Sequence, residues 1–106
     1  ANDYDFNNLF ERNVCGLGKK EDLLIGISTS GMSKNIELAV IAAKNKNITT
    51  IGFLGNKGGV LSELFDLSFI VPSKNTARIQ ECHITIGHAL IEYVEDQLIK
   101  EGLIDI

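Results

Sequence analysis

The sequence lacks the features that mark secreted and membrane proteins. It has one proline and only two cysteines, Cys15 and Cys82, with no Cys-x-x-Cys pair and no signal peptide at its start. A reducing, cytoplasmic setting is therefore expected. No apolar run approaches the ~20 residues that span a bilayer, so no membrane partner is expected.

An excess of basic charge is lacking too. The 10 Lys and Arg residues are outnumbered by 14 Asp and Glu, which gives a net charge of −4. Because a nucleic-acid backbone needs a basic face, nucleic acid is excluded as the main partner. A helix N-terminus still binds a small anion within an acidic protein, so a small anionic ligand remains open.

Apolar runs and helical periodicities alternate along the 106 residues. This alternation predicts βαβ units in one small domain, an α/β three-layer sandwich with a parallel sheet. We expect the first strand to be buried on both faces, Thr76 to cap the last helix and Cys82 to lie in the core. The expected strands are 23–28, 48–54 and 67–71, and the expected helices are 9–17, 33–46, 60–65 and 76–100.

Three strands alone make a poor domain. Both edges of such a sheet are open, and a chain of ~100 residues buries only about two-thirds of its surface. The sequence therefore predicts either a fragment or an obligate oligomer.

A turn rich in hydroxyl groups follows the first predicted strand and precedes a predicted helix. It contains Ser28, Thr29 and Ser30, and Ser33 stands at the helix N-cap. A helix N-terminus carries unpaired N–H groups and about half a positive charge, so hydroxyls around it favour a phosphate. The same pattern also suits an ordinary strand-to-helix turn with a serine cap.

The turn matches neither common nucleotide loop. It has no Lys-Ser/Thr pair of a P-loop and no Gly-x-Gly-x-x-Gly. A sugar phosphate monoester is therefore a better ligand than a nucleotide, and no nucleotide cofactor is expected. Because ligands of parallel sheets bind beyond the carboxyl ends of the strands, the loops at 55–59 and 73–75 are expected beside the turn.

The last predicted helix carries polar residues along an apolar face. Gln80 and His88 lie about two turns apart on one ridge, with Ile84 between them. His88 suits a general acid/base or a metal ligand, and equally a histidine that is hydrogen-bonded at a helix interface. For His83, a structural role as a hydrogen-bonded histidine at a helix interface is favoured over a catalytic or metal-binding role more strongly than it is for His88.

Four segments together resemble the sugar isomerase (SIS) domain of the bacterial phosphoheptose isomerase family. The most specific is Thr-Ala-Arg-Ile-Gln-Glu-x-His-Ile-x-Ile-Gly-His at 76–88, and the others lie at 26–33, 55–59 and 71–73. The resemblance implies interconversion of sedoheptulose 7-phosphate and D-glycero-D-manno-heptose 7-phosphate, a step toward lipopolysaccharide and surface heptoses. It covers nearly the whole of 1–106, as a partial SIS domain whose N-terminal half is missing.

The resemblance also implies roles for individual residues. His88 is similar to the catalytic histidine of the family, and Gln80 to its substrate- and metal-contacting glutamine. In members that bind zinc, one ion per subunit, these two residues are ligands together with a histidine and a glutamate from an earlier helix. The implied substrate-binding residues are Asn2, Asp3, Ser28, Thr29, Ser30, Ser33 and Gln80.

The resemblance further implies a homotetramer with active sites between subunits. The glutamate that serves as the other acid/base of the family has no counterpart in this sequence. Two alternatives stay open: a non-catalytic SIS protein that associates with the replication initiator, and a sugar-phosphate-sensing domain. His88 favours the enzyme, since the binding protein carries another residue there, and no DNA-binding segment supports the sensor.

Overall fold

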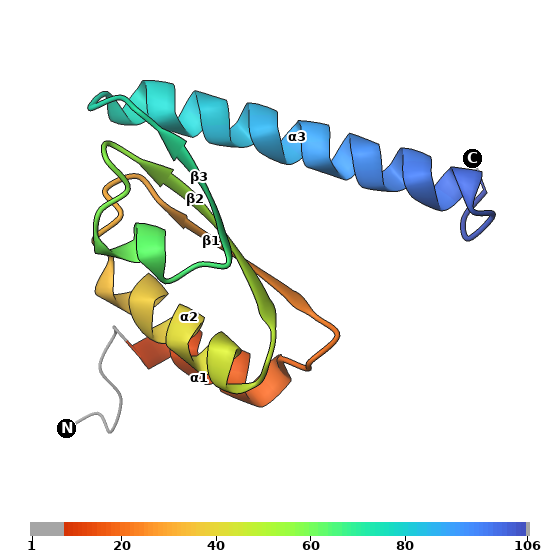
Figure 1. The fold of residues 1–106 in the computed structure, drawn as a ribbon, viewed down its shortest axis with the longest axis horizontal. Helices are drawn as coiled ribbons and strands as arrows, with labels where there is room; N and C mark the ends of the chain where they lie inside the picture. The colour runs from red at the N-terminus through yellow and green to blue at the C-terminus, as the bar shows by residue number, and fades with distance from the viewer. Residues whose placement is uncertain (1–7, 106) are drawn as a thin grey trace.

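The computed structural model describes residues 8–105, and it confirms the predicted α/β fold with a parallel sheet (Figure 1). Helix and strand bounds agree closely with the expected ones, except that the short helix near residue 60 is a 3-10 turn. The elements are α1 (Leu9–Leu17), β1 (Leu23–Ser28), α2 (Lys34–Asn45), β2 (Thr49–Gly55), η2 (Val60–Glu63), β3 (Leu67–Val71) and α3 (Thr76–Lys100).

The three strands lie in the order β1-β2-β3, and both neighbouring pairs are parallel. Ile27 of β1 is in register with Phe53 of β2, which is in register with Phe69 of β3. Parallel strands end at the same edge of a sheet. The loops that follow Ser28, Gly55 and Val71 therefore gather beside the start of α3 (Figure 1).

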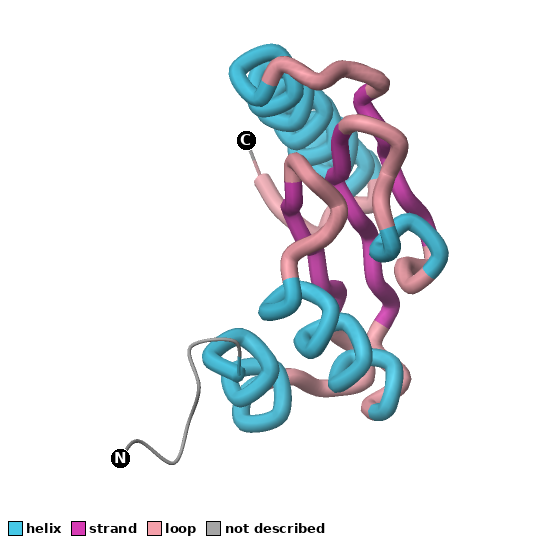
Figure 2. Tube along the Cα trace, turned by 90° about the vertical axis from the view of Figure 1, so that its left-hand side faces the viewer, coloured by secondary structure: helices cyan, strands magenta, loops and turns pink. Residues whose placement is uncertain are grey.

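One face of the sheet is covered by α2 and η2, and the core lies there. Val40, Leu54, Leu61 and Phe65 form its buried cluster. The Phe65 ring packs so closely on Gly26 of β1 and Gly52 of β2 that a Cβ at either position would fall within 2.6 Å of a ring carbon. Helix α1 packs on α2, at the side of this layer (Figure 2).

The other face of the sheet is only partly covered. Helix α3 contacts β2 and β3 near its N-terminal end, and its C-terminal part extends away from the sheet (Figure 1). As a result Leu23, Ile25 and Ile27 are exposed by 52%, 44% and 55%. The expectation that β1 is buried on both faces is therefore wrong, because no element among residues 8–105 covers its second face.

Helix α3 differs from the expectations in two details. Its N-cap is Asn75 rather than Thr76, and the Asn75 side chain accepts hydrogen bonds from the N–H groups of the next turn, Ala77 at 3.0 Å and Arg78 at 3.3 Å. Cys82 is exposed, so its expected core position is wrong. Among residues 8–105, none of the helices combines the length and the apolar composition that a membrane span requires.

Candidate functional site

The hydroxyls of the turn after β1 form one hydrogen-bonded cluster around Ser28. The buried Ser28 Oγ lies 2.8 Å from Ser33 Oγ and 3.5 Å from Ser30 Oγ, and it accepts a hydrogen bond from the Gly31 N–H at 3.1 Å. Ser33 does stand at the N-cap of α2, as predicted, but its side chain makes no capping bond.

In the first turn of α2 the Ile36 N–H donates to the Asn35 side chain at 2.9 Å and the Glu37 N–H to the Ser33 carbonyl at 3.0 Å. The N–H groups that begin the helix, at Lys34 and Asn35, lie beside the three serine hydroxyls.

The turn is held against the loop that follows β2. Gly31 and Gly59 both have positive φ, 71° and 60°, and the Gly31 carbonyl accepts a hydrogen bond from the Leu61 N–H at 3.1 Å. A Cβ on Gly31 would overlap the carbonyl oxygen of Gly58. Glycine is thus required for the backbones to approach this closely.

Two further hydrogen bonds connect the three loops at the carboxyl ends of the strands. The Asn56 side chain donates to the carbonyl of Thr29 at 3.1 Å, and the Asn56 N–H donates to the carbonyl of Ser73 at 3.0 Å. The loops enclose a cavity of about 430 Å³, a size that suits a small molecule. Its lining consists of Ser30, Asn56, Lys57, Gly59, Pro72, Ser73 and Lys74.

A second cavity lies between α3 and the sheet. Its volume is about 460 Å³, and Gln80 and His88 both line it. Their predicted position on one side of the helix is therefore confirmed, and both side chains are exposed to solvent. The remaining lining residues are Ile27, Phe53, His83, Ile84, Gly87 and Ile91.

His83 has the structural role that was favoured for it. It is 4% exposed, and its Nε2 lies 2.7 Å from the Leu54 carbonyl oxygen of β2. Because a carbonyl only accepts, this contact assigns the proton to Nε2. The imidazole thus joins the start of α3 to the central strand.

A metal ion would find part of a coordination shell in the α3 cavity. Gln80 offers an amide oxygen and His88 an imidazole nitrogen, two donors where structural and catalytic zinc sites use four positions. In the described part of the chain, no three His, Cys, Asp or Glu side chains are grouped to hold a metal. These residues therefore fit half of a zinc site.

The serine turn and the Gln80–His88 pair lie on either side of the carboxyl end of β1. Ser30 lines one cavity, Ile27 lines the other, and the two cavities share no lining residue. Asn2 and Asp3 lie outside the described residues. Lys57 and Lys74 were not predicted as site residues, although their loops were expected beside the turn.

The chain matches the model of one protein family, described as the SIS domain, over residues 5–94. A phosphoheptose isomerase from Clostridium acetobutylicum is 54% identical over 101 residues, which are 95% of this chain and 52% of the relative. A phosphoheptose isomerase from Sulfurimonas denitrificans is 46% identical over 103 residues, covering 97% of this chain and 53% of the relative.

Solved structures give the same picture. A phosphoheptose isomerase from Neisseria gonorrhoeae superposes with a TM-score of 0.85 at 41% sequence identity, covering 88% of this chain and 53% of that chain. The chain thus spans about half the length of the curated relatives it matches.

Proposed function

The chain belongs to the SIS domain family, and we propose that the protein is a phosphoheptose isomerase, interconverting sedoheptulose 7-phosphate and D-glycero-D-manno-heptose 7-phosphate. Relatives about half identical to the chain carry that name, which supports the proposal. The observation that carries it is the shared cavity of Gln80 and His88, which adjoins the strand that leads into the serine turn.

The serine turn is the proposed anchor for the phosphate. Ser28, Ser30 and Ser33 present their hydroxyls at the N-terminus of α2, where hydrogen-bond donors and the helix dipole both favour an anion, and Thr29 completes the set. An anchor at the remote phosphate fixes the reacting carbons of an open-chain sugar, which lowers the entropic part of the barrier.

His88 is the proposed proton-transferring residue. Aldose–ketose isomerisation through an enediol moves one proton between C1 and C2 and another between their oxygens. The exposed imidazole of His88 is accessible to a ligand in its cavity, whereas the buried His83 imidazole donates a hydrogen bond to the Leu54 carbonyl. Gln80 and Asp3 are proposed to orient the sugar.

We propose that Gln80 and His88 are two of the ligands of a zinc ion, and that groups other than these two fill the remaining coordination positions. When bound, the ion would polarise the carbonyl oxygen of the substrate. Removal of zinc by a chelator would then lower activity, and added zinc would restore it.

The proposed assembly is a homotetramer in the cytoplasm that serves lipopolysaccharide and surface heptose synthesis. Exposed apolar side chains on both β1 and α3 support association, among them Ile25, Ile27 and, on α3, Ile84 and Ile91, exposed by 59% and 67%. Light scattering that found only monomers at micromolar concentration would contradict the tetramer.

The reaction is tested directly by incubating the purified full-length protein with sedoheptulose 7-phosphate in D₂O. An enediol that exchanges its proton with solvent places deuterium at C2 of the heptose 7-phosphate, and mass spectrometry detects it. Formation of the labelled aldose is expected. Failure to form any heptose 7-phosphate by a folded protein that binds the ketose would refute the isomerase.

A further inference from the structure

The cavity beside the serine turn has a charge opposite to that of the whole chain. Its lining contains two ammonium groups, Lys57 and Lys74, and no carboxylate, whereas the chain has a net charge of −4. Both lysines are exposed, and no ion pair within residues 8–105 involves either of them. By contrast Lys34 and Lys44 each lie 3.4 Å from a carboxylate oxygen.

A phosphate ester needs positive charge around it, and the lysines in this lining can supply that charge. A phosphate monoester carries about −1.5 to −2 charges at pH 7. The serine hydroxyls of the turn are neutral, and the N-terminus of α2 contributes about +0.5. About 1 to 1.5 units of negative charge remain to be compensated. The basic side chains of the cavity into which Ser30 opens are Lys57 and Lys74.

Hydrogen bonds fix the backbone next to both lysines. Asn56, which precedes Lys57, donates to Thr29 in the serine turn and to Ser73, which precedes Lys74. The two lysines therefore extend from loops that are tied to the turn and to each other. A constrained backbone reduces the conformational freedom that is lost when such side chains bind an anion.

We propose that Lys57 and Lys74 bind the phosphate of the ligand and make the site selective for a dianionic ester over a monoanionic one. The proposal rests on the proposed function for the identity of the ligand, a sugar phosphate. It extends that function by assigning charge selectivity to two residues beyond the serine turn.

The test compares two esters of one sugar at one pH. Sedoheptulose 7-phosphate is nearly dianionic at pH 8, whereas sedoheptulose 7-sulfate is a tetrahedral monoanion. Calorimetric titration of the full-length protein is expected to show roughly threefold weaker phosphate-ester binding for Lys57→Met or Lys74→Met, and about tenfold for both together. Binding of the sulfate ester should weaken less than about twofold in each single variant and about threefold in the double variant, because a monoanion gains about half as much Coulomb energy from each lysine. The double Lys→Arg variant, which keeps both positive charges, should retain most of the phosphate-ester affinity.

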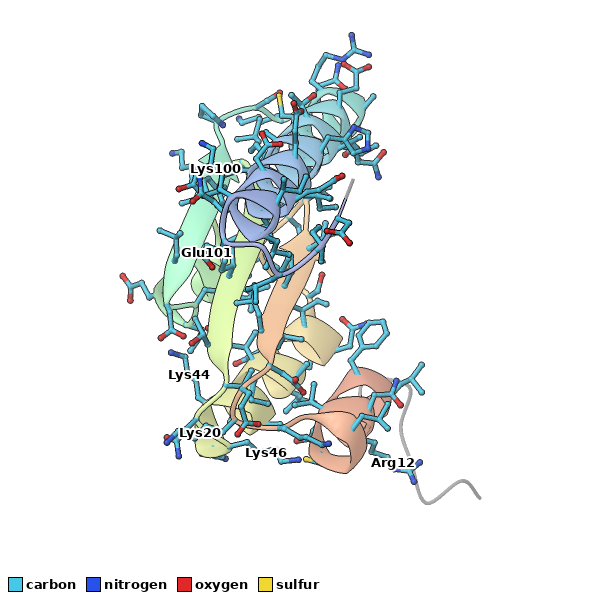
Figure 3. All side chains as sticks on the ribbon, turned by 90° about the vertical axis from the view of Figure 1, so that its right-hand side faces the viewer. Arg12, Lys20, Lys44, Lys46, Lys100 and Glu101 are labelled. Atoms are coloured by element: carbon cyan, nitrogen blue, oxygen red, sulfur yellow. The ribbon has the colours of Figure 1, made fainter. Side chains whose placement is uncertain are left out.

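Lys20→Met serves as the matched control, since Lys20 lies before β1 at the opposite end of the sheet (Figure 3). It should leave both affinities unchanged, and thermal melting checks that all variants fold. Equal losses for both esters, or no loss in the double variant, would overturn the charge selectivity even if the parent isomerises its substrate. If the lysine variants lose more affinity for the phosphate ester than for the sulfate ester, but the parent binds sedoheptulose 7-phosphate without isomerising it, the proposed function alone would be overturned.

Discussion

At the scale of single residues, glycine determines the shape of the serine turn. Gly31 has a φ of 71°, and a Cβ there would meet the Gly58 backbone. We expect Gly31→Ala to lower the free energy of unfolding by about 2 kcal/mol or more, because the left-handed conformation and the clash both oppose a side chain. Urea unfolding of the purified protein measures the change.

Gly16→Ala is the control for this substitution. Gly16 lies in α1, and within residues 8–105 a Cβ there would meet no atom of another element within 4 Å, so alanine should raise stability by as much as ~1 kcal/mol. If both variants were equally stable, the close approach of the turn to the loop after β2 would be wrong.

The Asp66 carboxylate connects the start of β2 to the segment before β3. Its pKa is lowered from the ordinary value of 3.8 chiefly because the Thr50 N–H donates to it at 2.8 Å, with the Thr50 hydroxyl at 3.1 Å and Lys44 adding to the effect. A lowered pKa contributes stability that is present above about pH 4 and is lost as the pH falls through the folded-state value.

Asp66→Asn should therefore lower stability at pH 7 more than at pH 3. Urea unfolding at the two pH values measures this, with Glu101→Gln, at the far end of α3, as a control that should show no such pattern (Figure 3). An equal loss at both values would mean that the ionised carboxylate contributes nothing.

At the scale of elements, the start of α3 depends on its cap. The Asn75 side chain accepts from two N–H groups of the first turn, whereas Thr76 lies inside the helix. Asn75→Ala is expected to cost about 1 kcal/mol of unfolding free energy, and Thr76→Ala much less. Thermal or urea unfolding of both variants decides between the two residues, and a larger loss for Thr76→Ala would contradict the assignment.

Strands and helices were predictable because each has a strong local signal. The run Leu23–Ser28 is apolar and short, and α3 has a regular helical period over 25 residues. The burial of β1 and of Cys82 was not predictable, because burial depends on which other elements cover a surface. A continuous apolar run indicates a strand with two apolar faces, but it does not indicate which element covers each face.

At the scale of the whole molecule, the sequence indicated each half of the site but not their relation. The serine turn and the Gln80–His88 pair were each predicted from local patterns. That they line separate cavities on either side of the end of β1 follows from the path of α3 across the sheet. Lys57 and Lys74 were missed because an exposed lysine in a loop has no signal of its own until the fold brings loops together.

The same arrangement separates binding from chemistry in the proposed isomerase. The serine turn would contribute to substrate affinity, and His88 to the rate of proton transfer. Substitution of His88 should thus change kcat far more than KM, whereas Ser30→Ala should raise KM and also lower kcat, because the phosphate anchor both binds the substrate and positions its reacting carbons.

The most direct test of this account is the steady-state turnover of sedoheptulose 7-phosphate by His88→Asn in the full-length protein. Glu101→Gln, at the C-terminal end of α3 and outside the lining of both cavities, is the control. We expect kcat to fall by roughly 100-fold or more for His88→Asn, with KM within a few-fold of the parent value, and Glu101→Gln to keep the parent activity. Turnover by His88→Asn within about threefold of the parent would contradict the central claim.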